Sequence, residues 1–136
     1  MKKVLLIAAS VVMVAGCAKV GGMWTAETMF KGPSSNTIRQ MSAHKLYTVP
    51  NADLCAAYHG TMPPPVKAEM VRRNLITSSD TWEDVNAGKV WKGMTLCEIF
   101  ASKGKPSSAV KGTSFTELDY GSGSYDFLNG KLDQFK

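Results

Sequence analysis

The sequence of 136 residues predicts an α+β fold, in which short helices pack on one face of a three-stranded antiparallel sheet. Three observations support this class. A helix-capping motif opens an apolar stripe near residue 95, the hydrophobic period changes to two after about residue 114, and an Asn-Gly pair separates the last two alternating segments. A chain of this length suits one small domain.

The helix at about residues 95–103 has the clearest local signals. Thr95 and Glu98 form a capping box, in which each side chain accepts a hydrogen bond from a backbone N–H at the other residue. Gly104 then permits a left-handed backbone, and Pro106 prevents the helix from continuing. The apolar stripe of this helix consists of Leu96, Ile99 and Phe100.

Three short strands are expected after this helix, over residues 115–120, 124–128 and 131–135. Asn129 and Gly130 predict a type I′ hairpin between the last two strands, because that turn requires a positive φ at both positions. Tyr125 and Phe127 share one face of the middle strand. We therefore expect an antiparallel sheet, with one face available to the preceding helices.

Further helices are expected earlier in the chain. One begins at Asn51, which we expect to act as its N-cap, and another begins near Pro65 after a proline triplet. The triplet is interpreted as a loop, with a polyproline ligand as the alternative. Arg72 and Arg73 are expected to face water, whereas Trp82, beside a third short helix, is expected in the core.

The first 16 residues resemble the signal peptide of a bacterial lipoprotein. Two lysines precede an apolar run from Val4 to Gly16, which is shorter than the roughly 20 residues that a membrane-spanning helix needs. The run ends in Val-Ala-Gly-Cys, which is similar to a lipobox. The resemblance implies lipidation of Cys17 and cleavage before it. A soluble secreted protein with an unrelated cysteine is the alternative.

Ala18 follows Cys17, at a position where an aspartate would resemble an inner-membrane retention signal. This favours a location at the outer membrane, lipid-anchored and facing the periplasm. Several acyl chains on one residue hold a protein to a membrane durably, whereas one chain holds it only reversibly. We therefore expect the membrane to be contacted through the N-terminal lipid.

We expect residues 17–50 to be the lipidated cysteine and a tether, and residues 51–136 to be the small α+β domain. Trp24 and Phe30 interrupt the polar character of the tether. They are interpreted as docking on the domain, as lying at the membrane interface, or as contacting a protein partner.

Cys55 and Cys97 remain after Cys17 is assigned to the lipid. Because disulfides persist in secreted proteins, we predict one bond between them, with two buried thiols as the alternative. His44 and His59 are the only histidines, and neither has ligand spacing to a cysteine. No metal site is expected.

The charge of the chain gives little support to nucleic acid binding. The 16 basic residues exceed the 11 acidic residues, and two lysines lie in the expected leader, so that 14 minus 11 leaves +3. This small excess is spread along the chain and forms no basic block. Nucleic acid is therefore not an expected partner.

No catalytic constellation is evident in the sequence, which lacks a nucleophile paired with a base or a metal-ligand cluster. Asp119 and Asp126 lie on adjacent predicted strands and are interpreted as polar residues of a solvated face. The GSGS segment at 121–124 lacks the strand-to-helix context of a phosphate loop. We expect no enzyme, no cofactor and no small-molecule substrate.

Residues 88–136 contain a Gly-Met-Thr turn, a short amphipathic helix, a Gly-x-Pro stop and an aromatic hairpin, carried by Gly93, Met94, Thr95, Gly104, Pro106, Tyr125, Phe127, Asn129 and Gly130. This pattern resembles the SmpA/OmlA family of small outer-membrane lipoproteins. The resemblance implies two helices packed on a three-stranded sheet and a role in an envelope assembly. Leu118 and Tyr120 stand where the family has a tryptophan, and residues 51–76 lie outside the pattern.

The function expected from these features is that of a non-catalytic interaction module in an envelope assembly, for outer-membrane protein assembly or envelope integrity. Trp24 and Phe30 are the candidate contacts with an envelope protein partner. One alternative is a periplasmic inhibitor of a lysozyme-like wall hydrolase. Another is a lipoprotein subunit of a secretion or conjugation apparatus.

Overall fold

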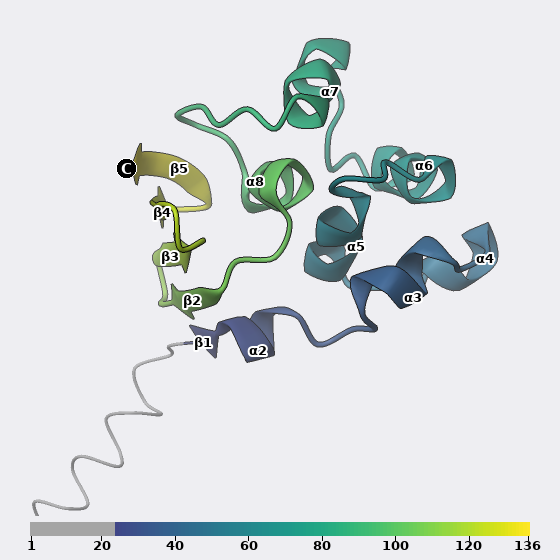
Figure 1. Cartoon of the computed structure of the whole chain (residues 1–136), viewed down its shortest axis with the longest axis horizontal. Helices are drawn as coiled ribbons and strands as arrows, with labels where there is room; N and C mark the ends of the chain where they lie inside the picture. Colours follow the sequence, from purple (N-terminus) through teal and green to yellow (C-terminus); the bar gives the residue numbers. More distant parts are fainter. Residues whose placement is uncertain (1–23) are drawn as a thin grey trace, which may run out of the picture.

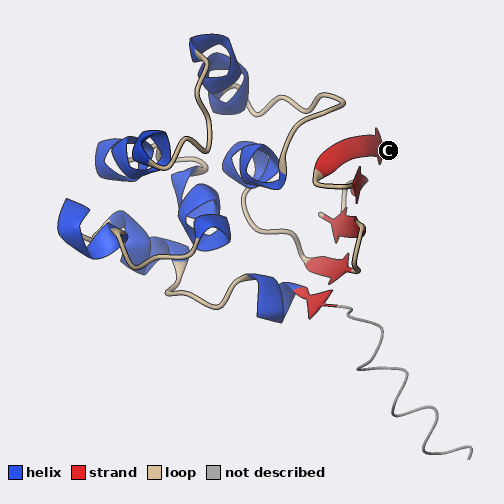
Figure 2. Ribbon diagram, turned by 180° about the vertical axis from the view of Figure 1, so that it is seen from behind, coloured by secondary structure: helices blue, strands red, loops and turns tan. Residues whose placement is uncertain are grey.

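The computed structural model describes the backbone of residues 24–136 and the side chains from Thr28 onward. One antiparallel sheet has the strand order β1-β2-β3-β4-β5, and the helices lie on one side of it (Figures 1 and 2). The predicted α+β class is therefore confirmed. The predicted number of strands is wrong, because two strands precede the three that were expected.

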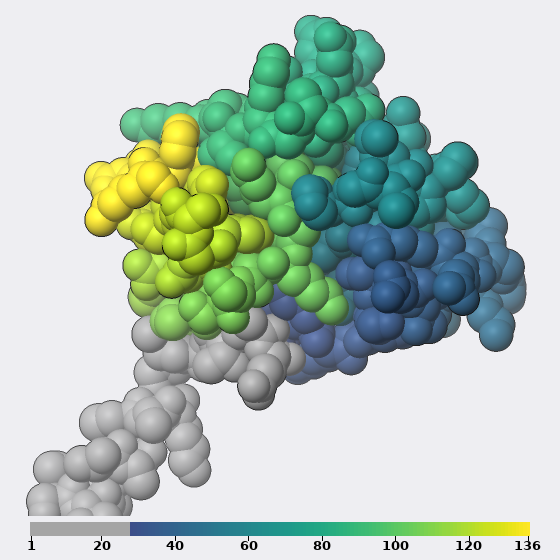
Figure 3. All heavy atoms as spheres, viewed as in Figure 1, coloured from purple at the N-terminus to yellow at the C-terminus, as the bar shows by residue number. Residues whose placement is uncertain are grey.

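The strands are β1 (Trp24–Thr25), β2 (Ser108–Lys111), β3 (Phe115–Asp119), β4 (Ser124–Leu128) and β5 (Lys131–Phe135). The helices in the described residues are α2 (Ala26–Met29), α3 (Ser35–Arg39), α4 (Ala43–Leu46), α5 (Asn51–Tyr58), α6 (Pro64–Arg72), α7 (Ser79–Asn86) and α8 (Leu96–Lys103). Figure 3 shows the C-terminal strands at one end of the molecule and the helices of the N-terminal half towards the other.

Helix α8 forms as the sequence predicts. The Thr95 N–H donates to Glu98 Oε1 at 2.7 Å, and the Glu98 N–H donates to Thr95 Oγ1 at 3.2 Å, which completes the capping box. Gly104 ends the helix with φ of 81°. A Cβ at this position would also lie 2.9 Å from the His59 ring, so that a larger residue would displace that ring as well as strain the backbone.

Helix α5 lies at the centre of the helical layer, behind α8 as seen from the sheet (Figure 1). Every residue from Asp53 to Tyr58 is buried, which explains why the helix is apolar on more than one side. The prediction that Asn51 caps this helix is wrong: Pro50 occupies the N-cap, and Asn51 is the first helical residue.

Strands β3, β4 and β5 form the predicted meander. Asn129 and Gly130 have φ of 52° and 82°, as a type I′ turn between β4 and β5 requires. One face of the sheet is buried against the helices through Leu118, Phe127 and Leu132. Strand β2 was missed because its four residues follow directly after the helix stop and show no clear alternation.

The expected tether over residues 17–50 is contradicted where the structure describes it. Ile38 of α3 and Leu46 of α4 are fully buried, and Val49 is 2% exposed. The Arg39 guanidinium donates to the Ala57 and His59 carbonyl oxygens, at 2.9 and 3.1 Å. This segment is therefore part of the folded domain.

Arg73 joins three parts of the helical layer. It pairs with Glu69 at 2.6 Å and donates to the backbone carbonyl oxygens of Leu46 and Val49, both at 2.7 Å. Its side chain is only 15% exposed, whereas that of Arg72 is 53% exposed. The expectation that both arginines face water therefore holds for Arg72 alone.

We expect Arg73→Met to lower the free energy of unfolding by about 2 to 3 kcal/mol, because Glu69 and two carbonyl oxygens lose a charged donor. Urea denaturation followed by circular dichroism measures the loss. Arg72→Met is the comparison: it also removes hydrogen bonds to Glu69, but the Arg72 guanidinium is 53% exposed and bonds no described backbone carbonyl, so its loss should be smaller. Equal losses in the two variants would contradict this role for Arg73.

Candidate functional site

A disulfide joins α5 to α8. Cys55 and Cys97 are bonded, with Sγ atoms 2.08 Å apart and Cα atoms 5.3 Å apart, which confirms the predicted pairing. Cys55 is fully buried, whereas Cys97 is partly buried and reaches a pocket on the surface of the helical layer. The bond therefore fixes one wall of that pocket.

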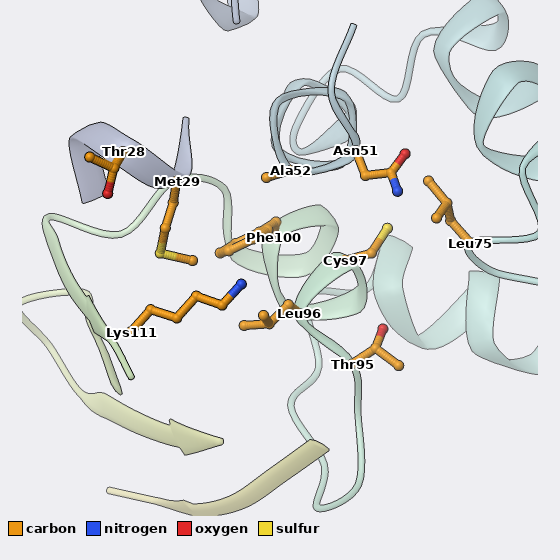
Figure 4. Close-up of a pocket in the computed structure, with 10 residues that line it drawn as sticks. All are labelled: Thr28, Met29, Asn51, Ala52, Leu75, Thr95, Leu96, Cys97, Phe100 and Lys111. Carbon is orange, nitrogen blue, oxygen red and sulfur yellow. The ribbon is translucent and has the colours of Figure 1, made fainter. Parts of the chain in front are cut away.

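This pocket lies between α2, α5, α8 and β2, and its volume is about 490 Å³. Its walls are mostly apolar. Helix α8 supplies three neighbouring side chains, and the opposite walls come from α2, from the start of α5 and from the loop after α6 (Figure 4). The residues that line it are Thr28, Met29, Asn51, Ala52, Leu75, Thr95, Leu96, Cys97, Phe100 and Lys111.

Several residues singled out from the sequence meet at this pocket. The Phe30 ring packs edge-on against Phe100, with centroids 4.9 Å apart, which confirms docking on the domain for this residue. The backbone of Trp24 pairs with Lys111 in the β1–β2 register. Phe100 and Lys111 both line the pocket, so Phe30 and the backbone of Trp24 each contact a lining residue.

Lys111 was not singled out by the sequence, because an isolated lysine in a short strand carries no signal. Figure 4 shows its side chain extending from β2 towards Leu96 and Phe100. It is the only charged residue among the described residues that line the pocket. The pocket thus combines apolar walls with one cationic group.

The second candidate site is the outer sheet face, which we define by Val110, Phe115, Glu117, Asp119, Asp126 and Leu128. None of the described elements covers this side of the sheet (Figure 1). Phe115 and Leu128 lie opposite each other in the register and are 41% and 50% exposed. A hollow of about 330 Å³ lies beside them, and Asp133 of β5 contributes to its lining.

Acidic side chains accompany this apolar pair. Glu117 and Asp126 lie directly opposite each other on β3 and β4, an arrangement of like charges that destabilises a sheet. Asp119 lies opposite Ser124, so that Asp119 and Asp126 do not form a facing pair. The outer sheet face therefore carries an apolar pair at one end of the β3–β4 ladder and acidic side chains further along it, while Lys131 of β5 lies opposite Leu128.

Two buried carboxyl groups have shifted pKa values in opposite directions. Hydrogen bonds from Arg72 and then from Arg73 lower the pKa of Glu69 to about 2. Burial raises the pKa of Asp53, although the Gly32 N–H donates to its Oδ2 at 3.0 Å and Lys105 acts in the same lowering direction. The Oδ1 atom of Asp53 is buried without a hydrogen-bond partner. Asp53 thus joins the loop before α3 to α5, whereas Glu69 pairs with two arginines at the end of its own helix.

The two histidines and Cys17 are the remaining residues that the sequence analysis considered as candidate sites. His44 lies on α4, its ring 5.8 Å from that of Tyr47, and His59 packs beneath Gly104. Among residues 24–136, no cluster of three His, Cys, Asp or Glu side chains has the arrangement of a metal site. Cys17 lies outside the described residues, and within them no helix has the length and apolarity needed to span a bilayer.

Comparisons with protein-family models, with curated proteins and with solved structures each returned no match to this chain. The resemblance to the SmpA/OmlA family remains a prediction from the sequence pattern.

Replacing both cysteines, Cys55→Ala with Cys97→Ala, should lower the free energy of unfolding by about 4 kcal/mol, because the bond closes a loop of 42 residues in the unfolded chain. Urea denaturation of the parent with and without a reductant should reproduce this difference. Two free thiols in the parent, detected by a thiol reagent under denaturing conditions without reductant, would contradict the bond.

Asp53→Asn should make the protein more stable than the parent at pH 7. The raised pKa of Asp53 means that its stabilising contribution is present below the unfolded value of 3.8 and is lost as pH rises through the folded value. The difference in melting temperature should therefore shrink as the pH falls towards 4. The exposed Asp80→Asn is the control for the loss of one carboxylate from the first turn of a helix.

Proposed function

We propose that this protein is a lipid-anchored, periplasm-facing interaction module that binds a protein partner of the cell envelope through the outer sheet face. The observation that carries this proposal is the exposure of Phe115 and Leu128 side by side on a sheet face that no described element covers. Exposed apolar patches with polar rims are typical of protein interaction sites.

Two features support the proposed location. The disulfide between Cys55 and Cys97 is typical of an oxidising compartment such as the periplasm. The lipobox-like sequence before Cys17 supports attachment of the chain to the outer membrane through a lipid. A role in outer-membrane protein assembly or envelope integrity rests on the resemblance of residues 88–136 to the SmpA/OmlA pattern.

The charge of the outer sheet face indicates the chemistry of the partner. Glu117 and Asp126 repel each other across β3 and β4, and a cationic side chain placed between them would relieve that repulsion. Complementary charge across an interface favours specificity and fast association. The partner surface is therefore expected to present lysine or arginine beside apolar side chains.

The test is affinity purification of the tagged full chain from a mild detergent extract, followed by mass spectrometry. We expect the parent to recover an envelope assembly and the double variant Phe115→Ser with Leu128→Ser to recover less than a tenth as much. Both side chains are exposed, so the fold should persist. A charge variant, Glu117→Lys, should weaken recovery in the same direction and make it less sensitive to salt.

Val71→Ser is the matched control, because Val71 is a 48% exposed apolar residue on α6, away from the sheet. Equal recovery of the same proteins by the sheet variant and the control would show that the outer sheet face is not the docking surface. Recovery of a wall hydrolase that the purified chain inhibits would instead support the inhibitor alternative.

A further inference from the structure

The pocket beside the disulfide has the size and lining of a small-molecule site. Its volume of about 490 Å³ falls in the range of roughly 300 to 1,000 Å³ that is typical of ligand pockets. Most of its lining is apolar, with Met29 on one wall, Leu75 on another, and Leu96 and Phe100 along α8. Such walls favour a hydrocarbon chain or ring.

The polar side chains that line the pocket differ in their hydrogen-bond and ion-pair partners. Asn51 Oδ1 accepts a hydrogen bond from Arg73 at 2.8 Å, and Thr95 Oγ1 accepts one from the Glu98 N–H. Lys111, by contrast, has no described carboxylate within ion-pair distance, although its side chain extends towards Leu96 and Phe100 (Figure 4). Lys111 therefore places a cation without a described ion-pair partner beside the apolar walls of the pocket.

We propose that this pocket binds an aliphatic carboxylate, such as a free fatty acid. The hydrocarbon chain lies against Met29, Leu96 and Phe100, where it replaces water along apolar surface. The carboxylate lies at the Lys111 ammonium, which supplies a charged donor. The pocket lies on the helical side of the sheet, so this proposal does not depend on the protein partner proposed for the outer sheet face.

The apolar walls and the Lys111 side chain together favour a carboxylate that carries a hydrocarbon chain. A small inorganic anion would leave the apolar walls in contact with water, and a neutral hydrocarbon would make no use of the Lys111 ammonium at the pocket. An amphiphile with one anionic end matches both. The disulfide holds α5 and α8 at one end of the pocket, so that a large part of its lining is preformed.

The test uses a diazirine-bearing analogue of dodecanoate on the full chain held in lipid nanodiscs, with photolabelled residues located by mass spectrometry. We expect labelling to concentrate in Met29, Leu96 and Phe100. Lys111→Met should reduce it at least five-fold, and Ala52→Phe, which places a ring in the pocket, should abolish it. The alcohol analogue should label the parent and Lys111→Met equally, because it carries no charge.

Lys103→Met is the matched control, since Lys103 is an exposed lysine at the end of α8 that does not line the pocket. Its labelling should equal that of the parent. Labelling spread evenly over the surface would falsify the proposal, as would equal labelling by dodecanoate of the parent and Lys111→Met. Because Lys111 is exposed, its variant should fold even where Ala52→Phe does not.

Discussion

The packing of α5 against α8 is the interaction on which the other layers depend. Helix α5 is buried over Asp53–Tyr58, and α3 and α6 pack on it while α7 packs on α8. The sheet then covers the remaining side of α8 (Figure 1). The bond between Cys55 and Cys97 makes this central contact covalent, so that loosening any outer helix leaves the helix pair in register.

The segment before α5 is held by polar contacts rather than by a continuous apolar stripe. Asp53 accepts from the Gly32 N–H, Arg39 donates to carbonyl oxygens at the end of α5, and Arg73 donates to carbonyl oxygens after α4. Each of these contacts joins residues 18 or more positions apart. Ile38 of α3, Leu46 of α4 and Val49 add buried apolar contacts to this attachment.

The difference between local contacts and contacts distant in the sequence explains which parts of the fold could be predicted from the sequence. The capping box of α8 and the Asn129-Gly130 turn are encoded by neighbouring residues, and both form as expected. Short helices such as α3 are stabilised by contacts with residues distant in the sequence. A segment of five residues is too short to show the hydrophobic period of a helix, so the sequence does not predict such helices. The disulfide could be predicted by counting cysteines. The pocket could not, because only the tertiary structure places Lys111 near Phe100. The outer sheet face likewise depends on the strand pairing that places Phe115 beside Leu128.

The two walls of the pocket are held with unequal strength, and this bears on how a ligand enters. On one side, α5 and α8 are linked by the disulfide, and Phe100 is 2% exposed within the core. On the other side, the described contacts of the α2 region include two residue pairs between β1 and β2 and the Phe30 ring packed on Phe100. Because a two-residue strand at a sheet edge has few backbone hydrogen bonds to lose, we infer that the α2 side opens first. A ligand that bridges Lys111 of β2 and Met29 of α2 would therefore tighten the weaker wall.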